Sequence, residues 1–186
     1  SIITVTQDVV DGGLFEAAID STKLYILDGA INMDGHQIEV PSTGIQMGGF
    51  GFDISSMTLT DTSTALFVNA VGGSGNILLE NLAISVTGAG SSVFAITDSD
   101  GTHACEFERV NYNNCTSLGY MDGYRQGLES GTGRFGGTPD LEFRGTWAGG
   151  YFITTSIVRG ITDSTYSLFK SAVGQTFASR LFSDAN

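Results

Sequence analysis

The sequence is poor in positive charge and in cysteine. Its 186 residues include eight Lys and Arg against twenty Asp and Glu, which gives a formal net charge of −12. A surface of this sign repels phosphate backbones and anionic lipid headgroups, so we expect neither nucleic acid nor a membrane as a partner. Two cysteines, Cys105 and Cys115, are too few for a disulfide framework. We expect one to be a small buried residue and the other to lie in a turn.

Long apolar runs and prolines are also scarce. The longest runs, Ile77–Leu79 and Val93–Ile96, are the length of single strands and far below the roughly 18 apolar residues of a membrane-spanning helix. No basic segment follows Ser1, so no signal peptide is expected. Hydrophobic residues still make up 41% of the chain, which is enough to build the core of one domain.

Signatures of cofactor and metal sites are missing or incomplete. Gly131–Gly136 matches the dinucleotide pattern G-x-G-x-x-G, but Gly137-Thr138-Pro139 follows it where a helix is required, so we interpret the segment as a turn. Asp98–Gly101 does not fit an EF-hand loop, because its glycine falls at position 4 instead of position 6. The two histidines, His36 and His103, belong to no zinc motif. The sequence therefore predicts no cofactor and no metal ion.

Helical periodicity is confined to one short segment near the N-terminus. Leu14, Phe15, Ala18 and Ile19 fall on one face of a helix over 14–19, and Asp11 precedes it in an N-cap-like position. We predict that residues 1–22 form a strand and a short helix that caps the fold.

From Lys23 onward the sequence repeats. Three segments of eight residues align, namely Phe52–Leu59, Ile77–Ile84 and Cys105–Tyr112. In each, apolar residues stand at the first, third, sixth and eighth positions, and the fifth position is a polar corner. We predict that residues aligned in this way stack on one inner face of adjacent rungs. The first column contains Phe52, Ile77 and Cys105, and the second contains Ile54, Leu79 and Phe107.

A further apolar segment lies between these repeats, at Ile45–Met47, Leu66–Val68 and Val93–Ile96. Three short strands to a repeat, each alternating inward and outward, are what a three-sided solenoid requires. We therefore predict an all-β fold, a single-stranded right-handed parallel β-helix over residues 23–186 with a short N-terminal capping helix. At its C-terminal end we expect either further sequence or an association of subunits, because nothing there closes the last rung.

Beyond residue 113 the pattern is less regular. Leu141–Phe143 and Thr146-Trp147 match the repeat only after a gap of 36 residues (141 − 105). We interpret 120–137, inside this gap, as a rung with a loop insertion.

Several segments together resemble a known family. They are the 14–19 helix, Tyr25–Leu27 with Gly29, Ile38–Pro41, Gly49–Asp53 and the stacked rungs. They resemble pectate-lyase-like right-handed β-helix proteins, in particular bacteriophage tail spikes, tail fibres and related virion proteins. The resemblance covers nearly the whole chain, rests on architecture and includes no catalytic motif. It implies a virion or extracellular location, a homotrimer, other virion subunits as partners, and contact with a cell-surface polysaccharide or receptor.

The segment that breaks the rung register is rich in aromatic and charged residues. Aromatic faces stack on sugar rings and guanidinium groups bond to hydroxyls, and loops on rigid scaffolds commonly carry binding sites. We therefore expect a structural and interaction protein that binds a glycan here, with core packing of the same aromatics as the alternative. The candidate binding residues are Tyr120, Tyr124, Arg125, Arg134 and Trp147.

An extracellular polysaccharide depolymerase, a hydrolase or a lyase, remains the rival hypothesis. Paired carboxylates are the chemistry it needs. The candidate catalytic residues are Asp122, Glu129, Asp140 and Glu142, with Arg125 as a base or charge neutraliser in a lyase. Glu106 and Glu108 also share one strand face, with Glu80 aligned beside Glu108. Such carboxylates are equally the ordinary surface of a soluble rod.

Overall fold

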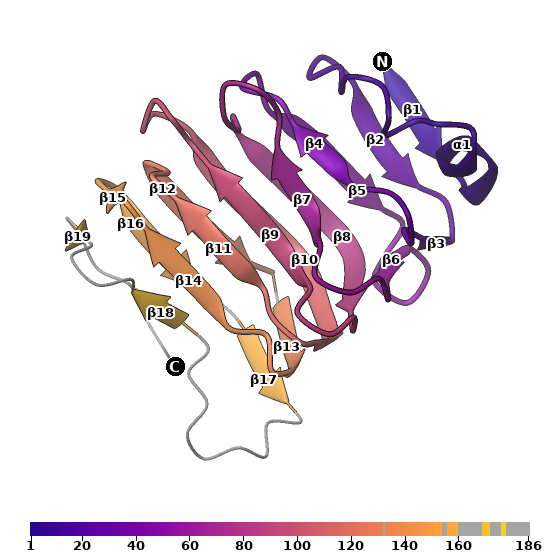
Figure 1. The fold of residues 1–186 in the computed structure, drawn as a ribbon. Helices are drawn as coiled ribbons and strands as arrows, with labels where there is room; N and C mark the ends of the chain where they lie inside the picture. Colours follow the sequence, from indigo (N-terminus) through magenta and orange to yellow (C-terminus); the bar gives the residue numbers. More distant parts are fainter. Residues whose placement is uncertain (132, 154–155, 160–168, 172–175, 178–186) are drawn as a thin grey trace.

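The chain is a parallel β-solenoid of about six turns, with 53% of its residues in strands and 3% in helix. The computed structural model describes residues 1–131, 133–153, 156–159, 169–171 and 176–177. Successive rungs lie side by side along the molecule from the N-terminal end to the C-terminal end (Figure 1). The predicted fold class is thus confirmed.

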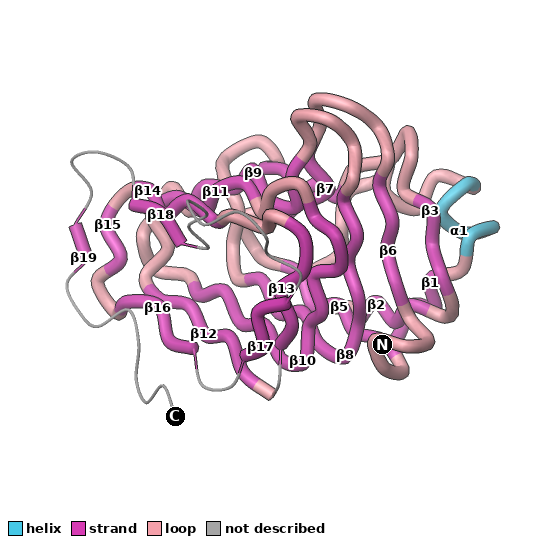
Figure 2. The backbone as a smooth tube through the Cα atoms, turned by 90° about the horizontal axis from the view of Figure 1, so that it is seen from below, coloured by secondary structure: helices cyan, strands magenta, loops and turns pink. Residues whose placement is uncertain are grey.

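The described strands form two long parallel sheets and one short one (Figures 1 and 2). The main path of the first sheet is β1 (Ile2–Val5), β2 (Leu24–Leu27), β5 (Ile45–Gly49), β8 (Ile77–Val86), β10 (Ala104–Cys115), β12 (Gln126–Ser130) and β16 (Gly150–Ile153). Its flank consists of β3 (Ala30–Asn32), β6 (Ser56–Leu59), β13 (Gly133–Gly137) and β17 (Ser156–Arg159). The second sheet contains β4 (Ile38–Val40), β7 (Ala65–Asn69), β9 (Ser92–Thr97), β11 (Gly119–Asp122), β14 (Leu141–Arg144) and β18 (Phe169–Ser171). The short sheet pairs β15 (Thr146–Trp147) with β19 (Thr176–Phe177).

Bends in the strands are made by residues in the left-handed backbone region. Asn81 in β8 and Arg109 in β10 both have φ of 55°, and they are the polar corners that the repeat predicts. Gly44 precedes β5 with φ of +94°, and a Cβ atom there would lie 2.6 Å from the Asn76 carbonyl oxygen of the next rung. This corner therefore requires glycine, since both the conformation and the contact exclude a side chain.

The core is built from inward residues that stack from rung to rung. Met47, Leu79 and Phe107 occupy paired positions on β5, β8 and β10, and all three are buried. Aromatic rings continue the stacking between the sheets, with Phe94 lying 5.4 Å from both Phe67 and Phe107 between ring centroids. The predicted alignment of Ile77–Ile84 with Cys105–Tyr112 is confirmed at every apolar position.

The third aligned segment, Phe52–Leu59, was predicted in the wrong register. Residues 50–55 form a loop between β5 and β6, in which Ile54 is 59% exposed. The true partners of Ile77 and Leu79 are Ile45 and Met47, and Met57 pairs with Ile84. The reason is an insertion at the corner, where the next two rungs bend at a single residue. Phe52 and Ile54 in this insertion have the same alternating apolar pattern as a strand.

Two other register predictions also need correction. Leu66–Val68 and Val93–Ile96 are neighbours as predicted, but their third partner is β4 and not Ile45–Met47, which lies in the first sheet. Leu141–Phe143 pairs with β11 in the second sheet instead of with β10. Residues 120–137 are no loop insertion, since they supply most of β11 and all of β12 and β13. Short turns there reduce the spacing between rungs to 22 residues, since Cys105 pairs with Gly127 (127 − 105). The sequence alignment of Leu141 with Cys105, 36 residues apart, therefore missed the rung that begins at β12.

The N-terminal helix lies earlier than predicted. Helix α1 spans Gln7–Asp11, with Thr6 as its extended N-cap residue. Gly13 has φ of 92°, and its N–H bonds to the Val10 carbonyl at 2.9 Å, which ends the helix. The glycines thus terminate a helix instead of preceding one, and Asp11 is its last residue and not a cap. Phe15 and Ile19 are nevertheless buried in the core, from a segment of turns.

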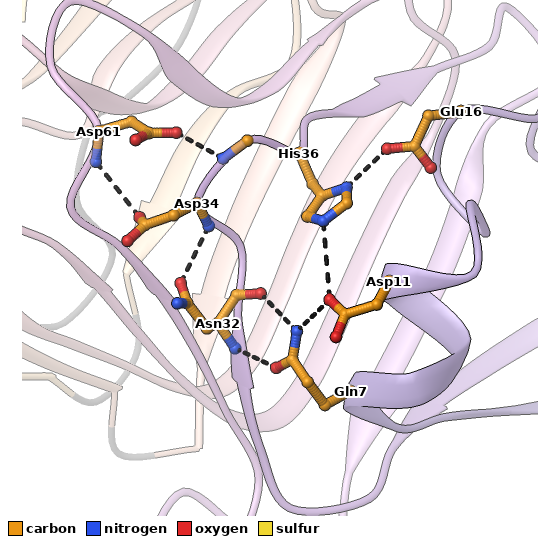
Figure 3. Close-up of polar contacts among 8 residues, drawn as sticks. Gln7, Asp11, Glu16, Asn32, Asp34, His36 and Asp61 are labelled. Atoms are coloured by element: carbon orange, nitrogen blue, oxygen red, sulfur yellow. Dashed lines mark hydrogen bonds and ion pairs between the residues drawn. The ribbon is translucent and has the colours of Figure 1, made fainter.

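A network of polar side chains holds the N-terminal segment against the first rungs (Figure 3). The Gln7 amide donates to the Asn32 carbonyl at 3.0 Å and accepts from the Asn32 N–H at 2.7 Å. His36 Nδ1 lies 2.6 Å from Glu16 Oε1, and this hydrogen bond holds the pKa of Glu16 below its usual value. Helix α1 stands beside β3 at the end of the solenoid (Figure 2), where the cap is expected.

Both cysteines are buried and free. Cys105 is the inward residue that the repeat predicts, whereas Cys115 ends β10 inside the core and does not lie in a turn. No helix in the described part of the chain is long and apolar enough to cross a membrane.

Inward and outward neighbours on β8 allow a direct test of the fold. Leu79 is fully buried, whereas Glu80 lies on the outer face and is partly exposed. Leu79→Ala should lower the free energy of unfolding by about 2–5 kcal/mol, because it leaves a cavity in the stacked column. Glu80→Ala should change it by about 0.5 kcal/mol or less. Chemical denaturation measures both values, and equal losses would refute the assignment of faces.

Candidate functional site

Two of the predicted binding residues lie inside the solenoid. Tyr124 and Trp147 are 0% exposed, and their ring centroids are 5.9 Å apart. The Trp147 indole N–H donates to the Arg144 carbonyl at 2.9 Å. These two aromatic rings therefore pack the core, and neither can touch a ligand at the surface.

Glu129 is also inside the core. It pairs in register with the inward residue Phe107, and its side chain is 0% exposed. Burial raises the pKa of this carboxyl well above its usual value, and a hydrogen bond with the Tyr151 hydroxyl opposes that shift. A substrate outside the solenoid cannot reach it, so a catalytic role for Glu129 conflicts with its position.

Three of the predicted residues meet on the outer face of β11 and β14. Tyr120 pairs in register with Glu142, and Asp122 pairs with Arg144. The Arg144 guanidinium lies 3.8 Å above the Tyr120 ring centroid and donates twice to Glu142 at 3.1 Å. Two of its five N–H donors are thus used within the protein, and one face of the guanidinium is covered by the Tyr120 ring.

The other predicted residues are dispersed. Asp140 lies two residues before Glu142 and forms an ion pair with Lys170, which pairs in register with Glu142. Arg125 is exposed directly before β12 and lies apart from this group. Arg144 was missed by sequence analysis, although its position two residues after Glu142 indicates the same strand face.

The Asp98–Gly101 segment is a turn held by its own aspartate. Asp98 accepts hydrogen bonds from the Asp100 N–H at 3.0 Å and the His103 N–H at 2.8 Å, and His103 Nδ1 lies 3.0 Å away. Burial raises the pKa of Asp98, but these hydrogen bonds outweigh it and bring the pKa below its usual value. In the described part of the chain no group of three or more His, Cys, Asp or Glu residues could hold a metal ion.

A hollow of about 250 Å³ opens on the outer face of the first sheet. Gln46, Leu78 and Glu106 stand in register across it on β5, β8 and β10. The Gln46 amide and the Glu106 carboxylate form no hydrogen bond or ion pair with the described residues, so both can bond to a ligand. We call this site the outer hollow, and it is lined by Ser21, Thr43, Gly44, Ile45, Gln46, Asn76, Ile77, Leu78, Ala104 and Glu106.

Two carboxylates lie beside the outer hollow on the same face. Glu80 and Glu108 are directly paired on β8 and β10, as the repeat predicts, and Glu106 is two residues from Glu108. Arg109 lies 3.3 Å from Glu108 and partly neutralises it. Adjacent strands are about 4.8 Å apart, so side chains at paired positions can bring two carboxyl groups to the separation of about 5–10 Å that glycosidases use.

The same sheet carries Arg134 farther along, past the corners at Asn81 and Arg109. Its guanidinium carbon lies 4.8 Å from the centroid of the Phe52 ring, which comes from the 50–55 loop. Arg134 pairs in register with Asn111 on β10, an outward residue that is only 2% exposed. We call this cluster of Phe52, Asn111 and Arg134 the Arg134 bend.

Comparison with known proteins gives no relative. No family model, no curated protein and no solved structure matches the chain. The function therefore has to be argued from the outer face of the solenoid itself.

The buried carboxyl of Glu129 predicts a pH dependence of stability. Because folding raises its pKa, its contribution to stability is greatest below the pKa of the unfolded chain, about 4.3, and is lost as the pH rises through the folded pKa. Glu129→Gln cannot ionise, so it should raise the free energy of unfolding at pH 7 by about 1–3 kcal/mol and flatten its pH dependence.

Denaturation curves between pH 4 and pH 8 measure this effect. Glu106→Gln makes the same chemical change at an exposed position, and we expect it to change stability by about 0.5 kcal/mol or less. A loss of stability in Glu129→Gln at pH 7 would mean that the carboxylate is ionised and held by its partners.

Proposed function

We propose that this protein is a surface-displayed interaction protein, a β-solenoid component of a phage tail or virion that binds a cell-surface glycan. The observation that carries the proposal is the outer hollow, in which the Gln46 amide and the Glu106 carboxylate have no hydrogen-bond partner among the described residues. Rigid parallel strands hold these side chains at fixed spacing, which lowers the entropic cost of binding.

The size and lining of the outer hollow fit one sugar ring. Its volume of about 250 Å³ is below the roughly 300–1,000 Å³ of sites for drug-sized ligands. Gln46 supplies both donors and an acceptor, Glu106 accepts from hydroxyls, and Leu78 offers an apolar surface to the C–H face of a ring. None of the described residues that line the hollow is Lys or Arg, and Glu106 is a carboxylate, so the hollow disfavours an anionic ring, and a neutral ring is the probe of choice.

A second candidate function is depolymerisation of the bound glycan. The pairing of Glu80 with Glu108 next to the outer hollow favours it, since these carboxylates would face a chain that extends out of the hollow. A reducing-sugar assay on a panel of glycans distinguishes the two functions. Release of new ends that is abolished by Glu108→Gln would favour the enzyme, and stable binding without cleavage favours the interaction protein.

Variants in the outer hollow test the proposed function. Gln46→Ala and Glu106→Gln each remove hydrogen bonds to a bound sugar, and we expect each to weaken binding of a neutral oligosaccharide by about 1–3 kcal/mol. Glycan-array screening followed by titration calorimetry on the full chain measures the loss.

Glu39→Gln is the matched control, since Glu39 is an exposed strand residue on the second sheet. It should leave the affinity unchanged. Unaltered affinity in both hollow variants, with binding intact, would show that the glycan lies elsewhere.

A further inference from the structure

Arg134 stands apart from most other cationic side chains of the described residues. Lys23, Arg109, Arg144 and Lys170 each have a carboxylate partner. Arg134 forms no ion pair or hydrogen bond with any side chain that the structure describes, although the chain carries a net charge of −12. Arg125 also has no carboxylate partner among the described residues, but it is exposed to solvent directly before β12. Arg134 is partly buried, where an unpaired charge is costly.

The guanidinium of Arg134 is held in a fixed orientation by Phe52. The 50–55 loop leaves the sheet beside β6, and β13 lies three strands away in the order β6, β8, β10, β13. The Phe52 ring nevertheless comes within 4.8 Å of the Arg134 guanidinium carbon. The outward residues Ala83 and Asn111, on the strands between, are almost fully buried, which fits a loop that crosses over them. The aromatic ring therefore supports one face of the guanidinium, as in a cation–π pair.

The hydrogen-bonding capacity of the Arg134 bend is unused. Arg134 Nε and Asn111 Oδ1 are both buried without a hydrogen-bond partner among the described residues. The two residues are paired in register, so a donor and an acceptor without partners lie side by side. The terminal nitrogens of Arg134 are not among the buried unpaired atoms, which leaves the guanidinium fork open on its outer edge.

We infer that the Arg134 bend is a second binding site, which takes a carboxylate carried by a hydroxylated ligand such as a uronic-acid sugar. The planar fork of Arg134 matches the two oxygens of a carboxylate, and Lys cannot reproduce this geometry. The side chains of Phe50 and Ile54, which are exposed on the same loop, supply apolar contact to the C–H face of the sugar ring. This site is distinct from the outer hollow, which has no cationic group.

The test is an NMR titration of the full chain with glucuronate, with glucose at equal concentration as the neutral probe. Glucuronate should shift the signals of the Arg134 bend and glucose should not. Arg134→Gln should abolish the shift, and Arg134→Lys should weaken binding about tenfold, since it keeps the charge and loses the fork. Arg125→Gln, the same change at an exposed arginine, should bind as the wild type does.

The remaining outcomes each decide the inference. If Arg134→Gln does not fold, the comparison of Arg134→Lys with wild type carries the test, because the charge is retained. Acetate binding at the same residues supports carboxylate recognition. Equal binding of glucose and glucuronate, stronger binding of inorganic sulfate, or unchanged binding in Arg134→Lys would overturn it. All of these results leave the proposed role of the outer hollow open, since its variants are tested with a neutral oligosaccharide.

Discussion

The fold depends on the parallel pairing of each rung with the next one in register. A single rung cannot bury its inner face, and only the residues stacked above and below it exclude water. This requirement fixes the register of the strands, whereas the corners between strands can differ in length from rung to rung. The 50–55 loop is an insertion at such a corner, where the following rungs bend at Asn81 and Arg109. The solenoid tolerates it because β5 and β6 still pair with β8 on either side.

The sequence predicts the rungs best where a strand is long and uninterrupted. β8 and β10 are such strands, and their inward residues from Ile77 and Cys105 onward align without a gap. Phe52 and Ile54 imitate this alternation within a loop, and nothing in a single sequence separates them from inward residues. Gly12 and Gly13 could likewise precede a helix or follow one, so the local sequence pattern alone could not place α1.

Site residues were harder to predict because successive residues of a strand point to opposite faces. A shift of one residue exchanges core and surface. Tyr124 and Trp147 were candidates for the surface because they lie in the segment where the sequence pattern gives no register, and both pack the core. The useful polar residues, Gln46 and Asn111, have no local signature. They matter because rungs distant in sequence place them beside Glu106 and Arg134.

The outer face of the first sheet has oppositely charged groups at its two ends, the outer hollow and the Arg134 bend. The outer hollow has a carboxylate and no cation, whereas the Arg134 bend has a cation with no carboxylate. Glu80 and Glu108 lie between them. Among the described residues of this face, carboxylates repel an anionic group, Arg109 is paired with Glu108, and Arg134 is the cation fixed by Phe52 that can attract the group. The acidic surface therefore makes the unpaired guanidinium of Arg134 selective, because it removes competing positions for a carboxylate on this face.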